Sequence, residues 1–130
     1  MKTQKGNCLI ECAVGGIFLI AVALFLLDGI AVLFASSVHD KLVFNAAKAA
    51  ATSRDNDARS AAEAMIANQS SKERLIRDIK IVKFDYVARQ RVEVTTEMNV
   101  RLPAPLPCLL KNIVFTARSI QPIVSAAPFI

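Results

Sequence analysis

The hydrophobic pattern of the chain divides it into regions of very different character. From Cys12 to Val38 nearly every residue is apolar, there is no Lys or Arg, and Asp28 is the single acidic residue. As an α-helix this stretch is about 40 Å long, whereas the hydrocarbon core of a bilayer is about 30 Å thick. The pattern therefore predicts one membrane-spanning helix, with an excess of length that tilt or projection into water absorbs.

A helical but less apolar pattern follows the span. In Lys41–Asn68, alanine and other small or apolar residues recur every three or four positions, and no Pro or Gly interrupts this segment or its junction with the span. We therefore expect one long helix, with a membrane part at residues 7–38 and an outer amphipathic part at 39–69. The narrow alanine stripe favours close contact with another helix, but it is also typical of an exposed helix of high propensity. Ser70 and Glu73 have capping-box spacing, which predicts a short helical turn next.

The hydrophobic period changes to two in the last part of the chain. Hydrophobic and polar residues alternate regularly in Val92–Leu102, which predicts a half-buried strand that ends at the prolines following it. The alternation in Ile79–Phe84 is imperfect, and a further strand is expected at Ile113–Ile120. Residues 70–130 are thus predicted to form a small β-rich module with an antiparallel sheet, and the fold class is α+β.

The charges beside the span indicate its orientation. Lys2 and Lys5 precede the span, whereas the His39-Asp40-Lys41 segment after it carries little net positive charge. By the positive-inside rule, the N-terminus is cytoplasmic and the C-terminal module lies outside. A cleaved secretory signal is the alternative, but the apolar run far exceeds the usual ~7–15 residues and no clear cleavage site ends it. We interpret His39 as an interfacial side chain at the point where the helix leaves the membrane.

Composition argues against several functional classes. The 130 residues carry a formal net charge of +5, but Lys and Arg alternate with Asp and Glu, so nucleic-acid binding has little support. One histidine and three cysteines at Cys8, Cys12 and Cys108 indicate neither a disulfide framework nor a zinc site, although Cys108 could pair with another subunit. We therefore expect no catalytic residues, no metal ligands, no cofactor and no small-molecule substrate, and predict that the protein is not an enzyme.

The N-terminus carries a motif with a specific chemical implication. Gly6 follows a short basic leader, and Glu11 comes five residues later, immediately before the span. A carboxylate in a bilayer is costly, at ~2.5–3.5 kcal/mol near the centre of a helix, so it is expected to have a partner or a function. The arrangement resembles a type IV prepilin leader, although Gly6 and Glu11 could also be ordinary juxtamembrane residues.

The prepilin resemblance implies a role for three residues. A prepilin peptidase would cut between Gly6 and Asn7, removing residues 1–6 as a leader and leaving a new α-amino group on Asn7. This group has a reference pKa of about 7.7–8.0 and is largely cationic at neutral pH. Asn7 and Glu11 are one helical turn apart, about 6 Å, so subunits offset by one turn could pair amine with carboxylate during assembly.

Taken in order along the chain, further features resemble TadE-like pseudopilins of tight-adherence (Flp/Tad) type IV pilus systems. They are Glu11 with Ala13, Asp28-Gly29, Asn45-Ala46-Ala47-Lys48, the Val- and Thr-rich strand Val92–Val100, and Leu106-Pro107. Asn7 stands where other type IV pilins commonly have Phe, which favours a minor pilin or pseudopilin over a major pilin. Asp28 is either an acid at the outer membrane interface or an intersubunit contact, and the sequence leaves both open.

The resemblance implies a bacterial inner-membrane protein with a single span and a periplasmic or extracellular C-terminal module, and it leaves open whether the protein is incorporated in the pilus. Its expected partners are the prepilin peptidase, other pilins and pilus assembly proteins, and its expected role is assembly of a pilus for adhesion or secretion. The alternative is an uncleaved single-pass accessory subunit of a pilus or secretion assembly.

Overall fold

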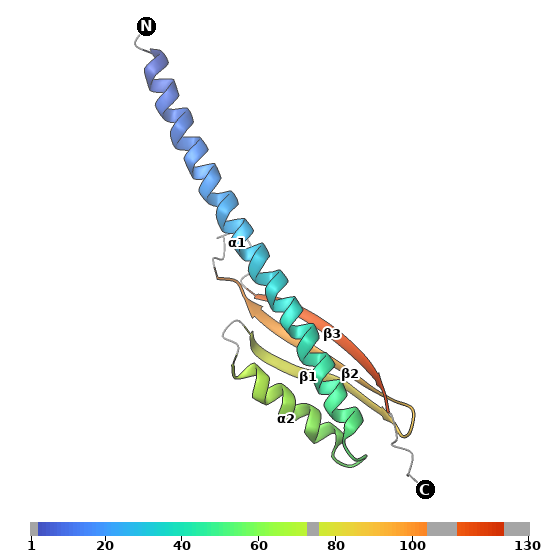
Figure 1. The fold of residues 1–130 in the computed structure, drawn as a ribbon. Coiled ribbons are helices and arrows are strands. Elements are labelled where there is room, and N and C mark those ends of the chain that lie inside the picture. Colours follow the sequence, from blue (N-terminus) through green and yellow to red (C-terminus); the bar gives the residue numbers. More distant parts are fainter. Residues whose placement is uncertain (1–2, 73–75, 104–111, 124–130) are drawn as a thin grey trace.

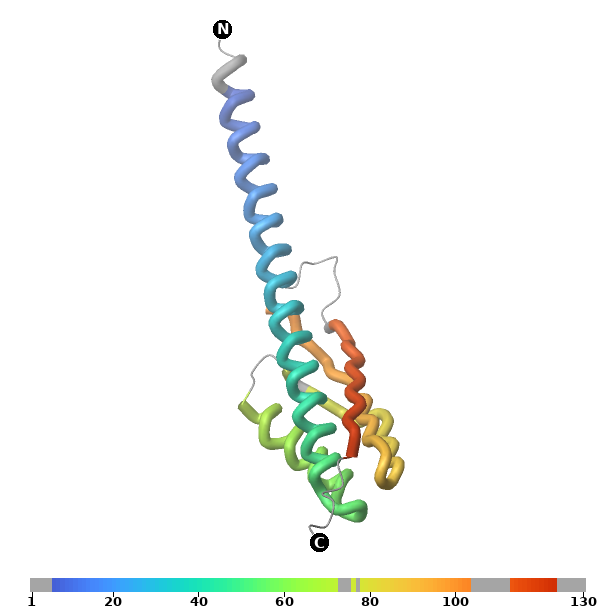
Figure 2. The backbone as a smooth tube through the Cα atoms, turned by 45° about the vertical axis from the view of Figure 1, so that its right-hand side comes forward, coloured from blue at the N-terminus to red at the C-terminus, as the bar shows by residue number. Residues whose placement is uncertain are grey.

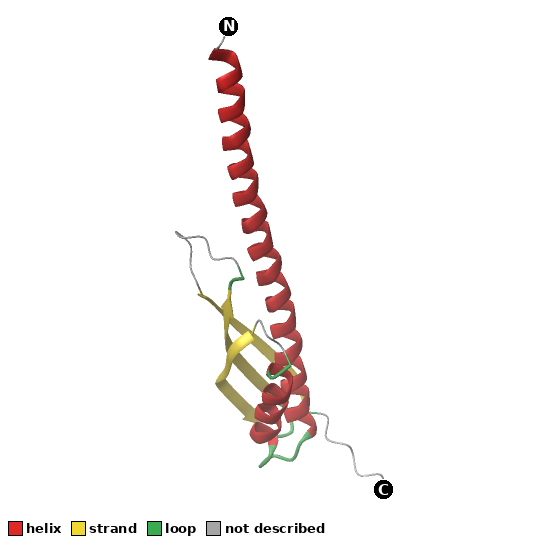
Figure 3. Ribbon diagram, turned by 90° about the vertical axis from the view of Figure 1, so that its left-hand side faces the viewer, coloured by secondary structure: helices red, strands yellow, loops and turns green. Residues whose placement is uncertain are grey.

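The computed structural model describes residues 3–72, 76–103 and 112–123, which form two helices and three strands (Figure 1). In chain order these elements are α1 (Thr3–Thr52), α2 (Ala58–Ser70), β1 (Ile76–Val87), β2 (Arg91–Arg101) and β3 (Asn112–Pro122). The helices lie on one face of the sheet, so that the folded part has two layers (Figure 3). The predicted α+β class, with a long apolar N-terminal helix and a small antiparallel sheet, is confirmed.

The sheet is an antiparallel meander in the order β1-β2-β3, with β2 in the centre. The alternation predicted for β2 is confirmed, because one set of alternate residues is buried beneath the helices: Val92, Val94, Thr96, Met98 and Val100. The expected third strand is also present and is slightly longer than predicted. Arg89 adopts a φ of 61° in the tight turn between β1 and β2, where the Gln90 amide donates to the Val87 carbonyl.

The imperfect alternation of β1 has a structural cause. The register between β1 and β2 shifts between Ile81 and Lys83, which is a β-bulge. The extra residue, Val82, is left 61% exposed, while Ile81 and Phe84 on either side of the bulge both pack against the buried cluster beneath the helices. A bulge adds one residue to one strand, and therefore interrupts the period of two that the sequence otherwise shows.

Helix α1 has two halves with different surroundings. Its N-terminal half extends away from the rest of the chain, and its C-terminal half crosses the sheet diagonally (Figures 1 and 2). The buried residues of the C-terminal half recur at helical spacing: Ala35, His39, Leu42, Val43, Ala46, Ala47 and Ala50. This spacing places one continuous stripe of α1 against the sheet and α2.

The predicted continuous helix to residue 69 is wrong beyond Thr52. Helix α1 ends there, and α2 begins at Ala58 after a turn of polar residues. The turn contains Ser, Asp and Asn, whose side chains compete with the helical backbone for hydrogen bonds. Ser53 Oγ donates to the Ala49 carbonyl at 2.8 Å and so occupies an acceptor at the helix end. The hydroxyl of Tyr86, on β1, donates to Asp55 and ties the turn to the sheet.

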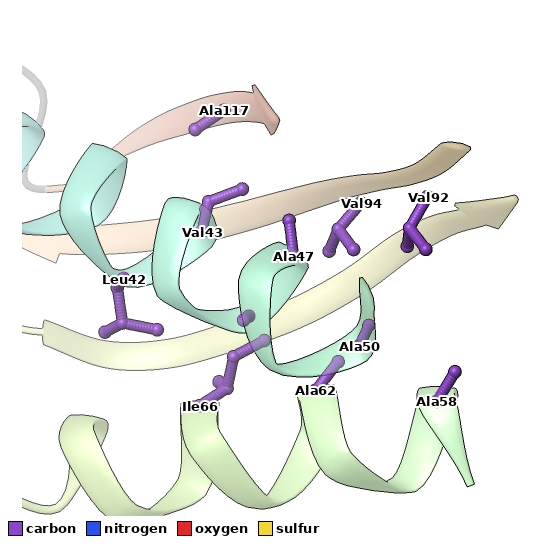
Figure 4. Packing of buried hydrophobic residues seen from close by; sticks show 11 residues of the cluster. Leu42, Val43, Ala47, Ala50, Ala58, Ala62, Ile66, Val92, Val94 and Ala117 are labelled. Atoms are coloured by element: carbon purple, nitrogen blue, oxygen red, sulfur yellow. The ribbon is translucent and has the colours of Figure 1, made fainter. Parts of the chain in front are cut away.

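Helix α2 runs back along α1, with Ala50 of α1 beside Ala62 of α2, whereas Ala47 points away from α2 toward the sheet (Figure 4). Ala46, Ala47 and Ala50 of α1, and Ala58 and Ala62 of α2, are all fully buried. Side chains of this size allow two helix backbones to approach closely. The predicted close contact with another helix is thus confirmed, and that helix is α2 of the same chain.

The capping-box prediction at Ser70 is wrong. Ser70 is the last residue of α2, and its hydroxyl donates to the Ala67 carbonyl at 3.3 Å. It therefore ends a helix instead of beginning one. Glu73, the other half of the predicted box, lies outside the described residues.

Candidate functional site

The N-terminal half of α1 is the candidate functional element. Within the described residues, α1 is the one helix long and apolar enough to cross a membrane, and only 6% of its most apolar 18-residue window is buried in the protein. Large hydrophobic side chains from Leu9 to Phe34 are exposed; Leu9, Ile17 and Leu33, for example, are 73%, 69% and 72% exposed. A helix in the core of a soluble domain has the opposite property, because its apolar side chains are covered by its own fold.

The structure places the three residues of the predicted processing and assembly site in the first turns of α1. Gly6, Asn7 and Glu11 are all helical and exposed, with no folded element beside them. A Cβ built at Gly6 meets no atom within 4 Å, so the glycine is not required by packing within the chain. The carboxylate of Glu11 forms no hydrogen bond or ion pair with another described residue, and exposed apolar side chains such as Ile10 and Val14 lie next to it along the helix.

Asp28 differs from Glu11 in its surroundings. It is only 8% exposed, so it is buried by the chain itself at the end of the apolar half of α1 nearest the folded domain. The two sequence alternatives placed this acid at a membrane interface or against another subunit. Burial within one chain leaves little of its surface for a second subunit, and an intersubunit role for Asp28 stays a prediction.

His39 is a residue that the sequence interpretation missed. It is 1% exposed, and its Nε2 shares a 2.7 Å hydrogen bond with Oγ1 of Thr96 on the central strand. Burial lowers the pKa of His39 below its ordinary value of 6.5, with partial opposition from the charge of Asp40. The interpretation as an interfacial side chain is therefore wrong. The signal was present in the sequence, because His39 falls on the helical stripe of Ala35, Leu42 and Ala46.

A second polar group lies on the sheet face that the helices leave open. Glu93 is 3% exposed, and its Oε1 accepts from Arg118 Nε at 2.9 Å and from Lys83 Nζ at 3.5 Å. Burial raises the pKa of Glu93, but Arg118 and Lys83 together outweigh this effect and leave the pKa below its ordinary value. The ion pairs of Glu93 with Lys83 and Arg118 thus join all three strands of the sheet.

The other chemical groups to consider in the described residues are metal-ligating side chains and thiols. No group of three or more His, Cys, Asp and Glu side chains in these residues could hold a metal ion. Cys8 and Cys12 are exposed thiols on α1, whereas Cys108 and the Leu106-Pro107 pair lie outside the described residues. Comparisons with family models, curated proteins and solved structures found no match to this chain.

Proposed function

We propose that this chain is a minor pilin or pseudopilin that contributes to the assembly of a tight-adherence (Flp/Tad) type IV pilus. The observation that supports the proposal best is the division of α1 into an exposed apolar half and a half packed on the sheet. Such a helix can remain in the inner membrane, or in a bundle of similar helices, while the folded domain stays in water. The role is structural and needs no enzymatic activity.

The proposed processing step removes residues 1–6 and leaves Asn7 as the N-terminus. Asn7 and Glu11 both lie on α1, about one helical turn apart. Both are exposed, so a helix of another subunit could contact them. In an apolar environment the carboxylate of Glu11 requires compensation, which the α-amino group of a neighbouring subunit would supply. The expected partners are accordingly the prepilin peptidase, other pilins and the pilus assembly proteins of the inner membrane.

Intact-mass analysis of the protein from membranes of its native host tests the processing step. The wild type should lack residues 1–6, and a Gly6→Ala variant should keep them. Because a Cβ at Gly6 meets no neighbouring atom, the substitution does not disturb the fold. A matched control is Gly15→Ala, which also meets no neighbour and should be processed normally.

The role of Glu11 requires a second experiment. A Glu11→Gln variant should be inserted and processed like the wild type but should enter assembled pili less efficiently. Normal piliation in this variant would contradict the assembly role. A full-length wild-type chain in the mass analysis would instead favour the alternative, an uncleaved single-pass accessory subunit.

A further inference from the structure

Helix α1 carries an exposed ridge in the part that packs on the sheet. The α1 ridge consists of Asp40, Lys41, Phe44 and Lys48, which recur at helical spacing on the side opposite the buried stripe. All four are exposed, and Phe44 is 49% exposed. They follow residue 38, the end of the proposed span, so lipid does not explain an aromatic side chain between two lysines.

A groove lies on another side of the domain, between α2 and the edge of β1 that is turned away from β2. It has a volume of about 540 Å³, which is ample for an aromatic side chain. Its apolar floor includes Ile66 of α2 with Ile79 and Ile81 of β1. Its rim carries charged residues, named here the groove rim: Glu63, Asp78 and Lys80.

The ridge and the groove lie at similar heights along the molecule. Helix α2 runs antiparallel to α1, with Ile66 between the levels of Leu42 and Ala50, and Ala62 near the level of Ala50 (Figure 4). Strand β1 runs in the direction of α1, because Ile76 shares a buried cluster with Ala35 whereas Tyr86 contacts Asp55 at the far end. Descending from the membrane side, the groove rim therefore presents Asp78 and Lys80 first and Glu63 last.

We propose that the α1 ridge of one copy of this chain docks in the α2–β1 groove of a second copy, with the two α1 helices parallel. Phe44 would cover the apolar floor formed by Ile66, Ile79 and Ile81. Each copy then offers a ridge on one side and a groove on another. Such a heterologous contact, made of two different surfaces, continues from copy to copy and forms either a closed ring or an open array.

The charges along the two surfaces match in this arrangement. Lys48, at the lower end of the ridge, meets Glu63 at the lower end of the groove, where the Glu63 carboxylate also accepts from Arg59 Nε at 3.0 Å within α2. At the upper end, Lys41 meets Asp78 and the neighbouring Asp40 meets Lys80. Opposite charges fix the register of a contact more than they strengthen it.

The orientation of α1 favours this contact over pairing of two copies through the edges of β3 that are turned away from β2. Two copies of β3 joined as antiparallel strands would point their α1 helices in opposite directions, so the two helices could not share one bilayer. Docking of ridge in groove keeps both helices in the same direction. The inference thus rests on the membrane anchorage in the proposed function, but not on leader processing or on the presence of a pilus.

Cysteine cross-linking in liposomes tests the contact directly. In a background with Cys8, Cys12 and Cys108 replaced by Ser, two differently tagged copies of the full chain are mixed, one with Lys48→Cys and one with Glu63→Cys. A short bis-maleimide should give mainly the mixed dimer. Homotypic dimers in equal or greater yield, or no dimer at all, would overturn the proposal. With Arg91→Cys in place of Lys48→Cys, the mixed dimer should be absent.

Charge exchange provides an independent readout. Energy transfer between labelled copies in the same liposomes should report association about two- to fivefold weaker for Lys48→Glu or Glu63→Lys alone. The double variant should regain wild-type association, because the pair is restored with reversed signs. Arg91→Glu should have no effect, and failure of the double variant to recover would count against the contact. Since purified chain alone is used, this outcome is independent of the processing experiment.

Discussion

Nε2 of His39 and Oγ1 of Thr96 lie 2.7 Å apart in the interior of the domain, although 57 residues separate them in the sequence. The pair joins α1, which carries the apolar N-terminal half, to the central strand of the sheet. The direction in which α1 leaves the domain is therefore set by buried contacts on both sides of His39, among them Ala35 and Leu42. Because this hydrogen bond lies where α1 meets the central strand, the stability of that contact should depend on both side chains and on pH.

Replacement of Thr96 by Val tests the contribution of this hydrogen bond. The change preserves the shape of the side chain but leaves a ring nitrogen of His39 buried without its partner, which should cost about 1–3 kcal/mol of stability. Urea unfolding of the full chain in detergent micelles measures the loss. Thr95→Val, on the open face of the sheet, is the control and should stay within about 0.5 kcal/mol of wild type. Equal effects of the two variants would refute a special role for Thr96.

Acid should destabilise the domain through His39. Because burial lowers the pKa of His39 in the folded chain, the unfolded chain binds the proton first as the pH falls below 6.5. The state that binds more protons gains stability, so the folded state loses stability between pH 6.5 and the lower folded pKa. Thermal unfolding across this range should show the slope, and it should be shallower in His39→Gln. An identical slope in the variant would assign the effect to other groups.

The contact between α1 and α2 should not tolerate a larger side chain. Ala62 is fully buried against α1, so Ala62→Leu should force the helices apart and cost about 1–3 kcal/mol. Ala64 lies on the exposed side of the same helix, and Ala64→Leu should be nearly neutral. Chemical denaturation of the two variants provides the comparison. If Ala62→Leu were equally neutral, the close packing of the hairpin would be wrong.

The charged group on the open sheet face should contribute stability that acid removes. The pKa of Glu93 is below its ordinary value of 4.5, so its contribution is complete above pH 4.5 and is lost as the pH falls through the folded pKa. Glu93→Gln should be less stable than wild type at neutral pH and should show less further loss on acidification. Unfolding curves at neutral pH and at a pH below 4.5 test this expectation, and a variant of an exposed acid, Glu97→Gln, is the control.

Several elements could be predicted from the sequence because local patterns encode them. The apolar run of α1 and the alternation of β2 each repeat over many residues with a single period, and both were located correctly. The turn between Thr52 and Ala58 was missed because uninterrupted helical spacing outweighed a short run of poor helix formers. The polar side chains of the turn are visible in the sequence. Whether they end the helix, however, depends on contacts between the turn and the rest of the fold, including the hydrogen bond from Tyr86 to Asp55.

The residues of the candidate site also differ in how much the sequence alone could predict about them. Gly6, Asn7 and Glu11 were proposed from the resemblance of the N-terminus to a type IV prepilin leader. Their proposed function involves an enzyme and other subunits, so the structure of one chain adds only their exposure and helical position. Asp28 looked similar to Glu11 in the sequence, yet one is buried by the folded chain and the other is not. Asp28 lies about two helical turns before Ala35, which packs against Met98 and Val100 of β2, whereas Glu11 lies much farther from the sheet along α1.

The period and length of a hydrophobic run are properties of neighbouring residues, which is why the sequence alone predicts a helix long enough for a membrane and a half-buried strand. The hairpin of α1 and α2, the burial of His39 and the pairing of Glu93 with Arg118 each join residues distant in the chain. Whether a polar side chain is buried or exposed depends on what packs against it, and that is decided when the helices cover one face of the sheet.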